Sequence, residues 1–190
     1  MYKILIISIL VVFSGLLSPQ KATAVHPDTN ATATTAVKWL TIEEAEKLTA
    51  KEPRKFFIDV YTDWCGYCKR MDANTFNVED VAAYLNAYFY PVKLNAEGKN
   101  PITVGGRTYV LRPGQRSHEL AIQILNGQMS YPTIAYMDET MQLITLVPGY
   151  HTPEELRPIL VFIAQDYYKT MNWEKFMQEW PKIIQAMNNR

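Results

Sequence analysis

The chain has 190 residues, and its 19 basic and 19 acidic side chains give a formal net charge of zero at neutral pH. No basic stripe is present, which argues against nucleic acid as a partner. With only two cysteines, the chain also falls outside the disulfide-stapled class of small exported domains.

The N-terminus has the features of a secretory signal peptide. Lys3 supplies a positive charge, and Ile4 to Leu17 form an apolar run shorter than the roughly 20 residues of a membrane span. An A-x-A cleavage site ends at Ala24. We predict a signal peptide over residues 1–24, with an uncleaved membrane anchor as the alternative. The mature protein would be periplasmic or secreted, and would begin with a small, polar, flexible leader over residues 25–38.

Cleavage would remove two lysines and no acidic residue, which leaves 17 basic and 19 acidic side chains. The remaining length, about 166 residues, suits one domain with a real hydrophobic core. Beyond the signal, no apolar run is long enough to predict a membrane span.

Helix and strand signals alternate along this domain. Apolar periodicity predicts helices over residues 42–50, 65–71, 78–89, 120–127 and 153–168. Short runs rich in aromatic and branched residues predict strands at 56–61, 90–94, 133–137 and 142–147. Two capping boxes, Thr41 with Glu44 and Thr152 with Glu155, mark the start of the first and last helices, and Asn77 is the expected cap of the third. The order predicts an α/β fold with a mixed central sheet and helices on both faces.

Residues 99–114 interrupt this pattern. Two short extended runs flank Gly105-Gly106, which is a hairpin signal. Arg107, Arg112 and Arg116 make the insertion and its flank basic, either as a solvated rim or as a docking surface for a partner.

The C-terminal segment, residues 169–190, is predicted to be a helical extension interrupted by Pro181. Its apolar residues recur at helical spacing: Trp173, Phe176, Trp180, Ile184 and Met187. We expect this stripe to dock on the domain's own surface, with a partner or a membrane surface as the alternative.

The cysteines, Cys65 and Cys68, lie three residues apart directly after a predicted buried strand. A loop this short adds little stability by chain entropy, so we expect the pair to serve chemistry rather than structure. Structural zinc needs about four ligands. Because His26, His118 and His151 have no motif spacing, no metal site is predicted, and the last two are expected to be capping or surface residues.

The sequence resembles the thioredoxin superfamily over most of residues 39–166. The resemblance rests on a W-C-G-Y-C motif after a strand, an acid six residues before the first cysteine, a lysine in the next strand and a Tyr-Pro-Thr loop followed by Gly149. In this chain these are Trp64 to Cys68, Asp59, Lys93 within Val92 to Asn95, and Tyr131 to Thr133. The flanking sequence is similar to the C-terminal periplasmic domain of the bacterial transmembrane disulfide reductase, whereas Gly66-Tyr67 is found in periplasmic disulfide isomerases.

The resemblance implies a thioredoxin-like fold and thiol–disulfide exchange. Exchange needs an attacking thiolate and a second thiol that resolves the mixed disulfide. At the start of a helix, Cys65 would be the exposed attacker, with a pKa lowered to between ~3.5 and 7.5, and Cys68 the shielded resolver. The two would form a reversible disulfide.

The accessory residues have two interpretations each. Asp59 would exchange a proton with Cys68 or would only pair with Lys93. Trp64 would shield the site or only pack. A cis-proline at position 132 would expose the backbone of the preceding residue to a substrate strand, whereas a plain turn would not. The residues expected to bind substrate are Trp64, Gly66, Tyr67, Tyr131 and Pro132.

Together these features predict a monomeric periplasmic thiol–disulfide oxidoreductase that needs no cofactor and reduces disulfides in exported proteins. A membrane disulfide reductase would supply its electrons. The alternatives are a disulfide isomerase, which would require another route than the usual dimerisation domain, and a non-catalytic thioredoxin-like binding module.

Overall fold

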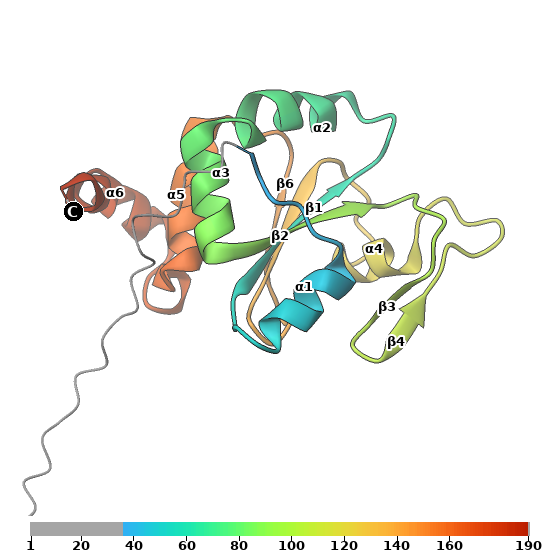
Figure 1. The fold of residues 1–190 in the computed structure, drawn as a ribbon. Coiled ribbons are helices and arrows are strands. Elements are labelled where there is room, and N and C mark those ends of the chain that lie inside the picture. Colours follow the sequence, from blue (N-terminus) through green and yellow to red (C-terminus); the bar gives the residue numbers. More distant parts are fainter. Residues whose placement is uncertain (1–35, 190) are drawn as a thin grey trace, which may run out of the picture. The chain divides into compact units, whose positions relative to one another are not determined.

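The computed structural model describes residues 36–189, and the predicted signal peptide and most of the predicted leader lie outside this range (Figure 1). Its centre is a four-stranded sheet with the order β2-β1-β5-β6. The strands are β1 (Lys55–Tyr61), β2 (Phe89–Asn95), β5 (Thr133–Met137) and β6 (Leu143–Pro148). β1 runs parallel to β2 and antiparallel to β5, which in turn is antiparallel to β6, so the predicted mixed sheet is confirmed.

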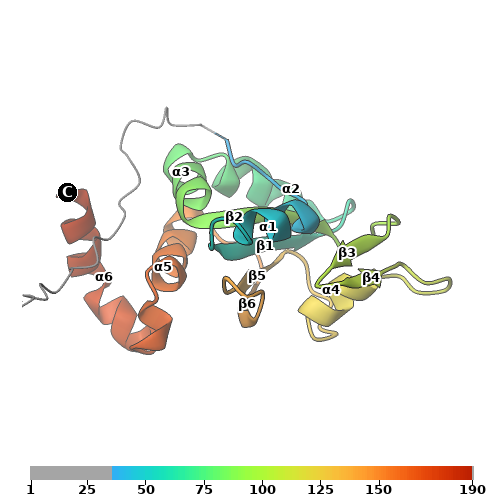
Figure 2. The same ribbon diagram turned by 60° about the horizontal axis from the view of Figure 1, so that its bottom comes forward.

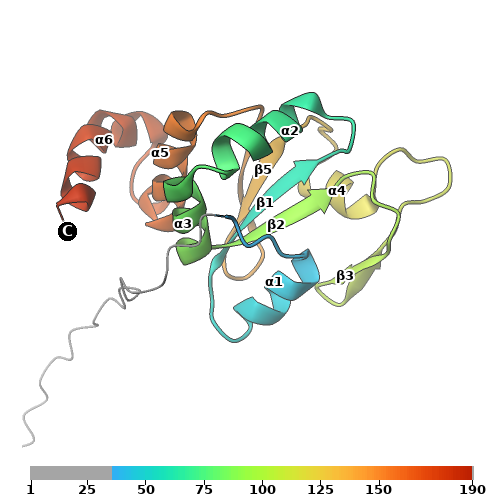
Figure 3. The same ribbon diagram turned by 45° about the horizontal axis from the view of Figure 1, so that its top comes forward.

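Helices cover both faces of the sheet. They are α1 (Ile42–Thr49), α2 (Gly66–Met71), α3 (Glu79–Tyr88), α4 (Glu119–Ile124), α5 (Pro153–Ala164) and α6 (Trp173–Asn188). A π-helical turn, η1 (Asp72–Phe76), extends α2, and a 3₁₀ turn, η2 (Tyr167–Lys169), follows α5. Figures 1 and 3 show α2 and α3 on the opposite side of the sheet from α1.

Successive side chains of β1 point to opposite faces of the sheet and so belong to two separate core clusters. Phe56, Ile58 and Val60 pack with α1, α4 and β2, whereas Phe57 packs with α3 and α5 on the other face. Because side chains alternate along a strand, Asp59 shares the face of Phe57. An acidic residue is therefore held within the layer that α2, η1 and α3 cover.

Both predicted capping boxes are present. The Thr41 and Thr152 hydroxyls accept from the amides of Glu44 and Glu155, whose carboxylates accept in return from the capping residues' amides. The predicted cap at Asn77 is wrong. Asn77 has helical backbone angles at the end of η1, so the chain first becomes extended at Val78, which is the residue that precedes α3.

The predicted helix over residues 153–168 is also too long. α5 ends at Ala164, since Asp166 adopts a left-handed conformation with φ of 59° that no α-helix continues. Pro181, by contrast, lies inside α6 without ending it. It removes one hydrogen bond at an exposed position, and the helix continues beyond it.

The predicted hairpin is confirmed as β3 (Ile102–Val104) and β4 (Arg107–Tyr109). Gly105 and Gly106 both have positive φ, as a two-residue hairpin turn requires. Val104 and Tyr109 are buried in the α1 cluster, so the insertion is part of the core. Figure 2 shows this hairpin and α6 at opposite ends of the domain.

The C-terminal extension docks on α5, as the apolar stripe predicted. Phe176 is fully buried, and its ring centroid lies 4.9 Å from that of Phe162. No helix within residues 36–189 has both the length and the apolar character that crossing a bilayer requires.

Candidate active site

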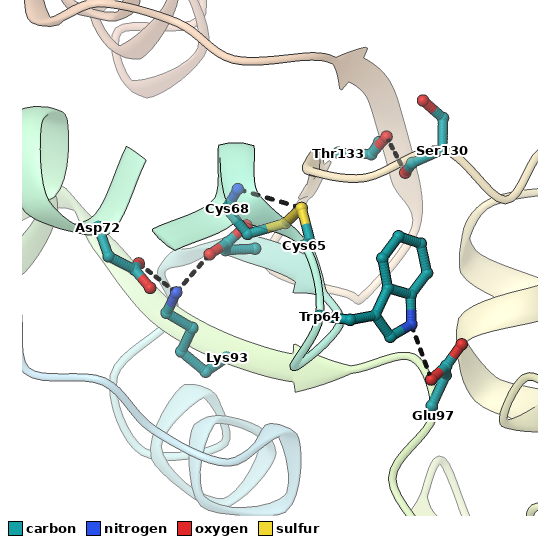
Figure 4. The surroundings of a disulfide bond; sticks show 9 residues. Trp64, Cys65, Cys68, Asp72, Lys93, Glu97, Ser130 and Thr133 are labelled. Atoms are coloured by element: carbon teal, nitrogen blue, oxygen red, sulfur yellow. Dashed lines mark hydrogen bonds and ion pairs between the residues drawn. A yellow bond between two sulfur atoms is a disulfide. The ribbon is translucent and has the colours of Figure 1, made fainter. Parts of the chain in front are cut away.

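The two cysteines lie where β1 gives way to α2. Cys65 is the N-cap of α2, and its sulfur forms a disulfide with Cys68 across a Cα–Cα distance of 5.3 Å (Figure 4). The backbone amide of Cys68 donates to Cys65 Sγ at 3.1 Å. After reduction the same amide is placed to stabilise a thiolate on Cys65, which is the attacking form of the sulfur.

The cysteines are less open than the sequence suggested. Cys65 was expected to be exposed, but in this oxidised form it is 5% exposed and Cys68 is 1% exposed. The order of exposure still agrees with attack by Cys65 and resolution by Cys68, because the second sulfur lies one helical turn further into the core.

An ion-pair network joins β1, which precedes the cysteines in the chain, to β2 and η1, which follow them. Asp59 on β1 and Lys93 on β2 are directly opposite each other in the parallel register, and Lys93 Nζ donates to Asp59 Oδ2 at 2.6 Å. Lys93 also donates to Asp72 Oδ1 of η1 (Figure 4). One lysine therefore joins a carboxylate that is 1% exposed to one that is 45% exposed.

Burial decides the protonation behaviour of this pair. Burial raises the pKa of Asp59, and the charge of Lys93 offsets only part of that effect. Burial alone would lower the pKa of Lys93, but its two carboxylate partners outweigh this and raise it. Both shifts favour the protonated form of the side chain, which is the charged form of Lys93 and the neutral form of Asp59. Within the described chain, Asp59 Oδ1 is buried without a hydrogen-bond partner.

Three aromatic rings surround the ammonium group of Lys93. The ring centroids of Trp39, Tyr61 and Phe76 lie 4.8, 4.9 and 5.5 Å from Nζ. Cation–π attraction of this kind stabilises the charged lysine. Neither Asp72 nor these rings were predicted as site residues from the sequence. Asp72 lies four residues after Cys68, and this i, i+4 spacing was the available signal.

Exposed aromatic side chains flank the disulfide on both sides. Trp64 is 66% exposed, donates from Nε1 to Glu97 at 3.0 Å and meets the ring of Tyr131 edge-on at 6.0 Å. Tyr67 is 63% exposed, and its ring lies 6.4 Å from that of Tyr150. Both rings are exposed enough to contact a bound polypeptide, and a shielding role for Trp64 stays a prediction.

The remaining predicted substrate residues also lie near the motif. The Tyr131–Pro132 peptide bond is cis, and Pro132 is held by its carbonyl, which accepts from the amide of Gly149 at 2.8 Å. The adjoining loop from Ser130 to Thr133 lies among the surroundings of the disulfide in Figure 4. A side chain added at Gly66 would meet open space. The use of these groups by a substrate stays a prediction.

His26 lies outside the described residues, and the other two histidines form no hydrogen bond or ion pair with Asp59, Lys93 or Asp72. His118 is buried and caps α4, since its Nδ1 accepts from the amide of Leu120 at 3.3 Å. His151 accepts at its carbonyl from the Thr75 hydroxyl at 2.7 Å. No cluster of three or more His, Cys, Asp or Glu side chains that could hold a metal ion occurs in residues 36–189.

Comparison with known proteins supports the architecture. A family model described as a thioredoxin-like domain matches residues 42–164. The solved structure of a DsbH oxidoreductase is 13% identical with a TM-score of 0.51, covering 78% of this chain and 95% of that chain. A thioredoxin-fold protein from Helicobacter pylori is 20% identical with a TM-score of 0.52, covering 72% and 86%. These matches confirm the predicted thioredoxin-like fold.

The similar structures also include the reduced C-terminal domain of DsbD from Neisseria meningitidis. It is 16% identical with a TM-score of 0.44, covering 64% of this chain and 93% of that domain. No curated protein sequence matches the chain.

Proposed function

Because the chain belongs to the thioredoxin-like domain family, we propose that its Cys65–Cys68 pair is a redox centre that reduces disulfides in exported proteins. One observation carries this proposal. The two cysteines form a disulfide at the start of α2, and a buried carboxylate with a raised pKa, Asp59, lies on the strand that leads to it. Thiol–disulfide exchange needs such a sulfur pair and a place for the resolving thiol's proton.

The reaction would begin with the reduced dithiol. The Cys65 thiolate attacks one sulfur of a substrate disulfide, so that a Cys65–substrate disulfide forms and the other substrate sulfur leaves as a thiolate. Cys68 then loses its proton and attacks Cys65 Sγ. The Cys65–Cys68 disulfide forms, the mixed disulfide breaks and the second substrate thiolate leaves. Two electrons pass from the protein to the substrate.

Asp59 would serve the second of these steps. Burial raises its pKa, which makes the ionised carboxylate a stronger base, and its Oδ1 has no hydrogen-bond partner in residues 36–189. Lys93 would limit how far the pKa of Asp59 rises, because its ammonium group, 2.6 Å from Asp59 Oδ2, favours the ionised carboxylate.

Export and recycling complete the proposal. The signal-peptide pattern of residues 1–24 supports a periplasmic or secreted location. The oxidised product would need an external dithiol to return two electrons and two protons, and a membrane disulfide reductase is the proposed donor. We expect the protein to act as a monomer.

Insulin reduction tests the activity. In the presence of a chemical dithiol, the wild-type protein should accelerate the precipitation of insulin chains, whereas Cys65→Ser should not. A wild-type protein that fails to accelerate it would support the binding-module alternative instead.

Refolding of scrambled ribonuclease tests the direction of the chemistry. A reductase should catalyse this refolding only weakly. Strong catalysis by the purified protein together with weak insulin reduction would sink the reductase proposal and favour the isomerase.

A further inference from the structure

An apolar groove lies beside the sheet, between β6 and the helices α5 and α6. Its volume is about 880 Å³, which is large enough for several side chains. Its lining comes from β6, α5, α6 and the segments that connect them, and includes Ile144, Thr145, Val147, Ile159, Trp173 and Met177. Trp173 and Met177 remain 37% and 38% exposed, so the helix that forms one wall presents large apolar side chains to solvent.

The strand that forms the other wall ends the sheet. One edge of β6 pairs with β5, and its other edge pairs with no strand of residues 36–189. An irregularity in the pairing occurs near Leu143, and from Thr145 to Pro148 the strand is regular. Natural edge strands are usually blocked by charged residues or by proline within the strand. Here Leu143 to Val147 contain neither, and the proline of β6, Pro148, is its last residue, so the edge from Leu143 to Val147 is open to pairing.

The groove and the open edge belong to one surface. In the antiparallel register Thr145 and Val147 lie opposite Tyr136 and Ile134, which are buried on the α5 face of the sheet. These two β6 side chains therefore point to the same face and line the groove. An added strand on β6 would place alternate side chains on that face, against the wall formed by α5 and α6.

This surface continues to the cysteines. β6 is followed by Gly149, whose amide binds the Pro132 carbonyl, and by Tyr150, whose ring lies 6.4 Å from that of Tyr67 in the C-G-Y-C motif. The next residue, His151, lines the groove. A polypeptide whose disulfide lies at Cys65 therefore reaches the groove by crossing Tyr150.

We infer that the groove binds an extended apolar segment of a disulfide-containing polypeptide, as a strand added to β6, while its disulfide is reduced at Cys65. This inference rests on the proposed function and specifies its substrate class. The occupant is an extended chain because the site combines an open strand edge with an apolar wall. Non-native exported proteins match this substrate class, because they expose apolar segments and disulfides together, whereas native proteins bury them.

Two synthetic peptides test the inference. Each carries one cysteine as a mixed disulfide with nitrothiobenzoate, followed by a glycine–serine spacer of graded length. One ends in alternating valine and threonine, and the other has serine in place of each valine. Attack by reduced Cys65 on the peptide sulfur releases the coloured nitrothiobenzoate thiolate, and the free nitrothiobenzoate disulfide serves as a small substrate.

At the best spacer length, the wild type should have a KM about tenfold lower for the valine peptide, a preference equivalent to ~1.4 kcal/mol. Met177→Lys places a charge in the groove and should make the KM values for the two peptides about equal. Gln178→Lys adds the same charge at the neighbouring exposed position of α6, outside the lining, and should keep the preference. Thermal unfolding of both variants verifies that α6 is retained.

Equal KM values for the two peptides, or an unchanged preference in Met177→Lys, would overturn the inference while leaving the reductase intact. Failure to reduce the small disulfide as well would overturn the proposed function and the inference with it. Sedimentation tests the two other possible occupants of the groove, which are a second copy of the chain and a membrane surface. A wild-type dimer that Met177→Lys dissociates, or binding to anionic lipid vesicles that Met177→Lys abolishes, would assign the groove to a second copy or to a membrane surface and overturn the inference.

Discussion

Replacing Lys93 by methionine keeps the length of the side chain and removes its charge, which leaves Asp59 buried without a cation. At 2.6 Å and an effective dielectric constant of about 20, the gross attraction in this pair is about 6 kcal/mol. Desolvation offsets much of that, and breaking a buried pair from one side costs ~3–5 kcal/mol. Because Lys93 is itself 20% exposed, we expect the lower end, a loss of about 3 kcal/mol near pH 7. For a chain of this size the Tm should fall by about 6–12 °C.

The loss should depend on pH with a defined sign. Burial raises the folded-state pKa of Asp59 above its unfolded value, so Asp59 favours folding most below the unfolded pKa, near ~3.9, and this contribution is lost as pH rises through the folded pKa. Without Lys93 the folded pKa rises further. The difference in unfolding free energy between wild type and Lys93→Met should therefore be smallest below the unfolded pKa of Asp59 and should grow as the pH rises through the folded pKa values.

Urea unfolding of the oxidised proteins at several pH values measures this difference. The double variant Asp59→Asn/Lys93→Met should recover most of the lost stability at neutral pH, because no ionisable acid remains buried. A loss that is constant across the pH range, or a double variant no more stable than Lys93→Met, would refute the reasoning.

Three further perturbations test other parts of the structure. Asp59→Asn should slow release of the mixed disulfide at neutral pH in stopped-flow measurements, with little effect on the first attack. If the rates of both steps are the same as in the wild type, Asp59 is only a structural partner of Lys93. In the reduced protein, Cys65 should be alkylated at mildly acidic pH far faster than Cys68, as peptide mass spectrometry can show, and the reverse order would exchange their roles. Thr152→Ala removes the side-chain cap of α5 and should lower the unfolding free energy by about 1 kcal/mol; a change below ~0.3 kcal/mol in urea unfolding would contradict the capping assignment.

Much of the fold was predictable because it rests on local signals. The capping boxes at Thr41 and Thr152 satisfy helix amides from within a few residues. The run from Phe56 to Tyr61 is apolar on both faces of the strand except at Asp59, as is typical of a central strand. The helix end at Asp166 was not predictable in this way, because a left-handed residue other than glycine carries no clear sequence mark.

The candidate site also has a part that was predictable from local sequence and a part that depends on tertiary packing. Cys65, Cys68, Asp59 and Lys93 come from a motif with defined spacing, and the structure brings the last two into contact across β1 and β2. In the sequence, Asp72 looks like any solvent-exposed acidic residue of a helix. Its contact with Lys93 depends on the tertiary structure, which brings the end of the lysine side chain to η1. The groove likewise depends on how α6 packs on α5, which no local pattern determines.

The hairpin insertion separates the two halves of the central sheet along the chain. β1 and β5 are neighbours over five residue pairs, yet one precedes and the other follows the exposed loop at Arg116. The next exposed arginine, Arg112, is followed by proline, which resists trypsin. Tryptic cleavage after Arg116 should give two complementary fragments, one with both cysteines and the other with Pro132. We expect them to stay joined through the sheet in native gel filtration and to separate only in denaturant.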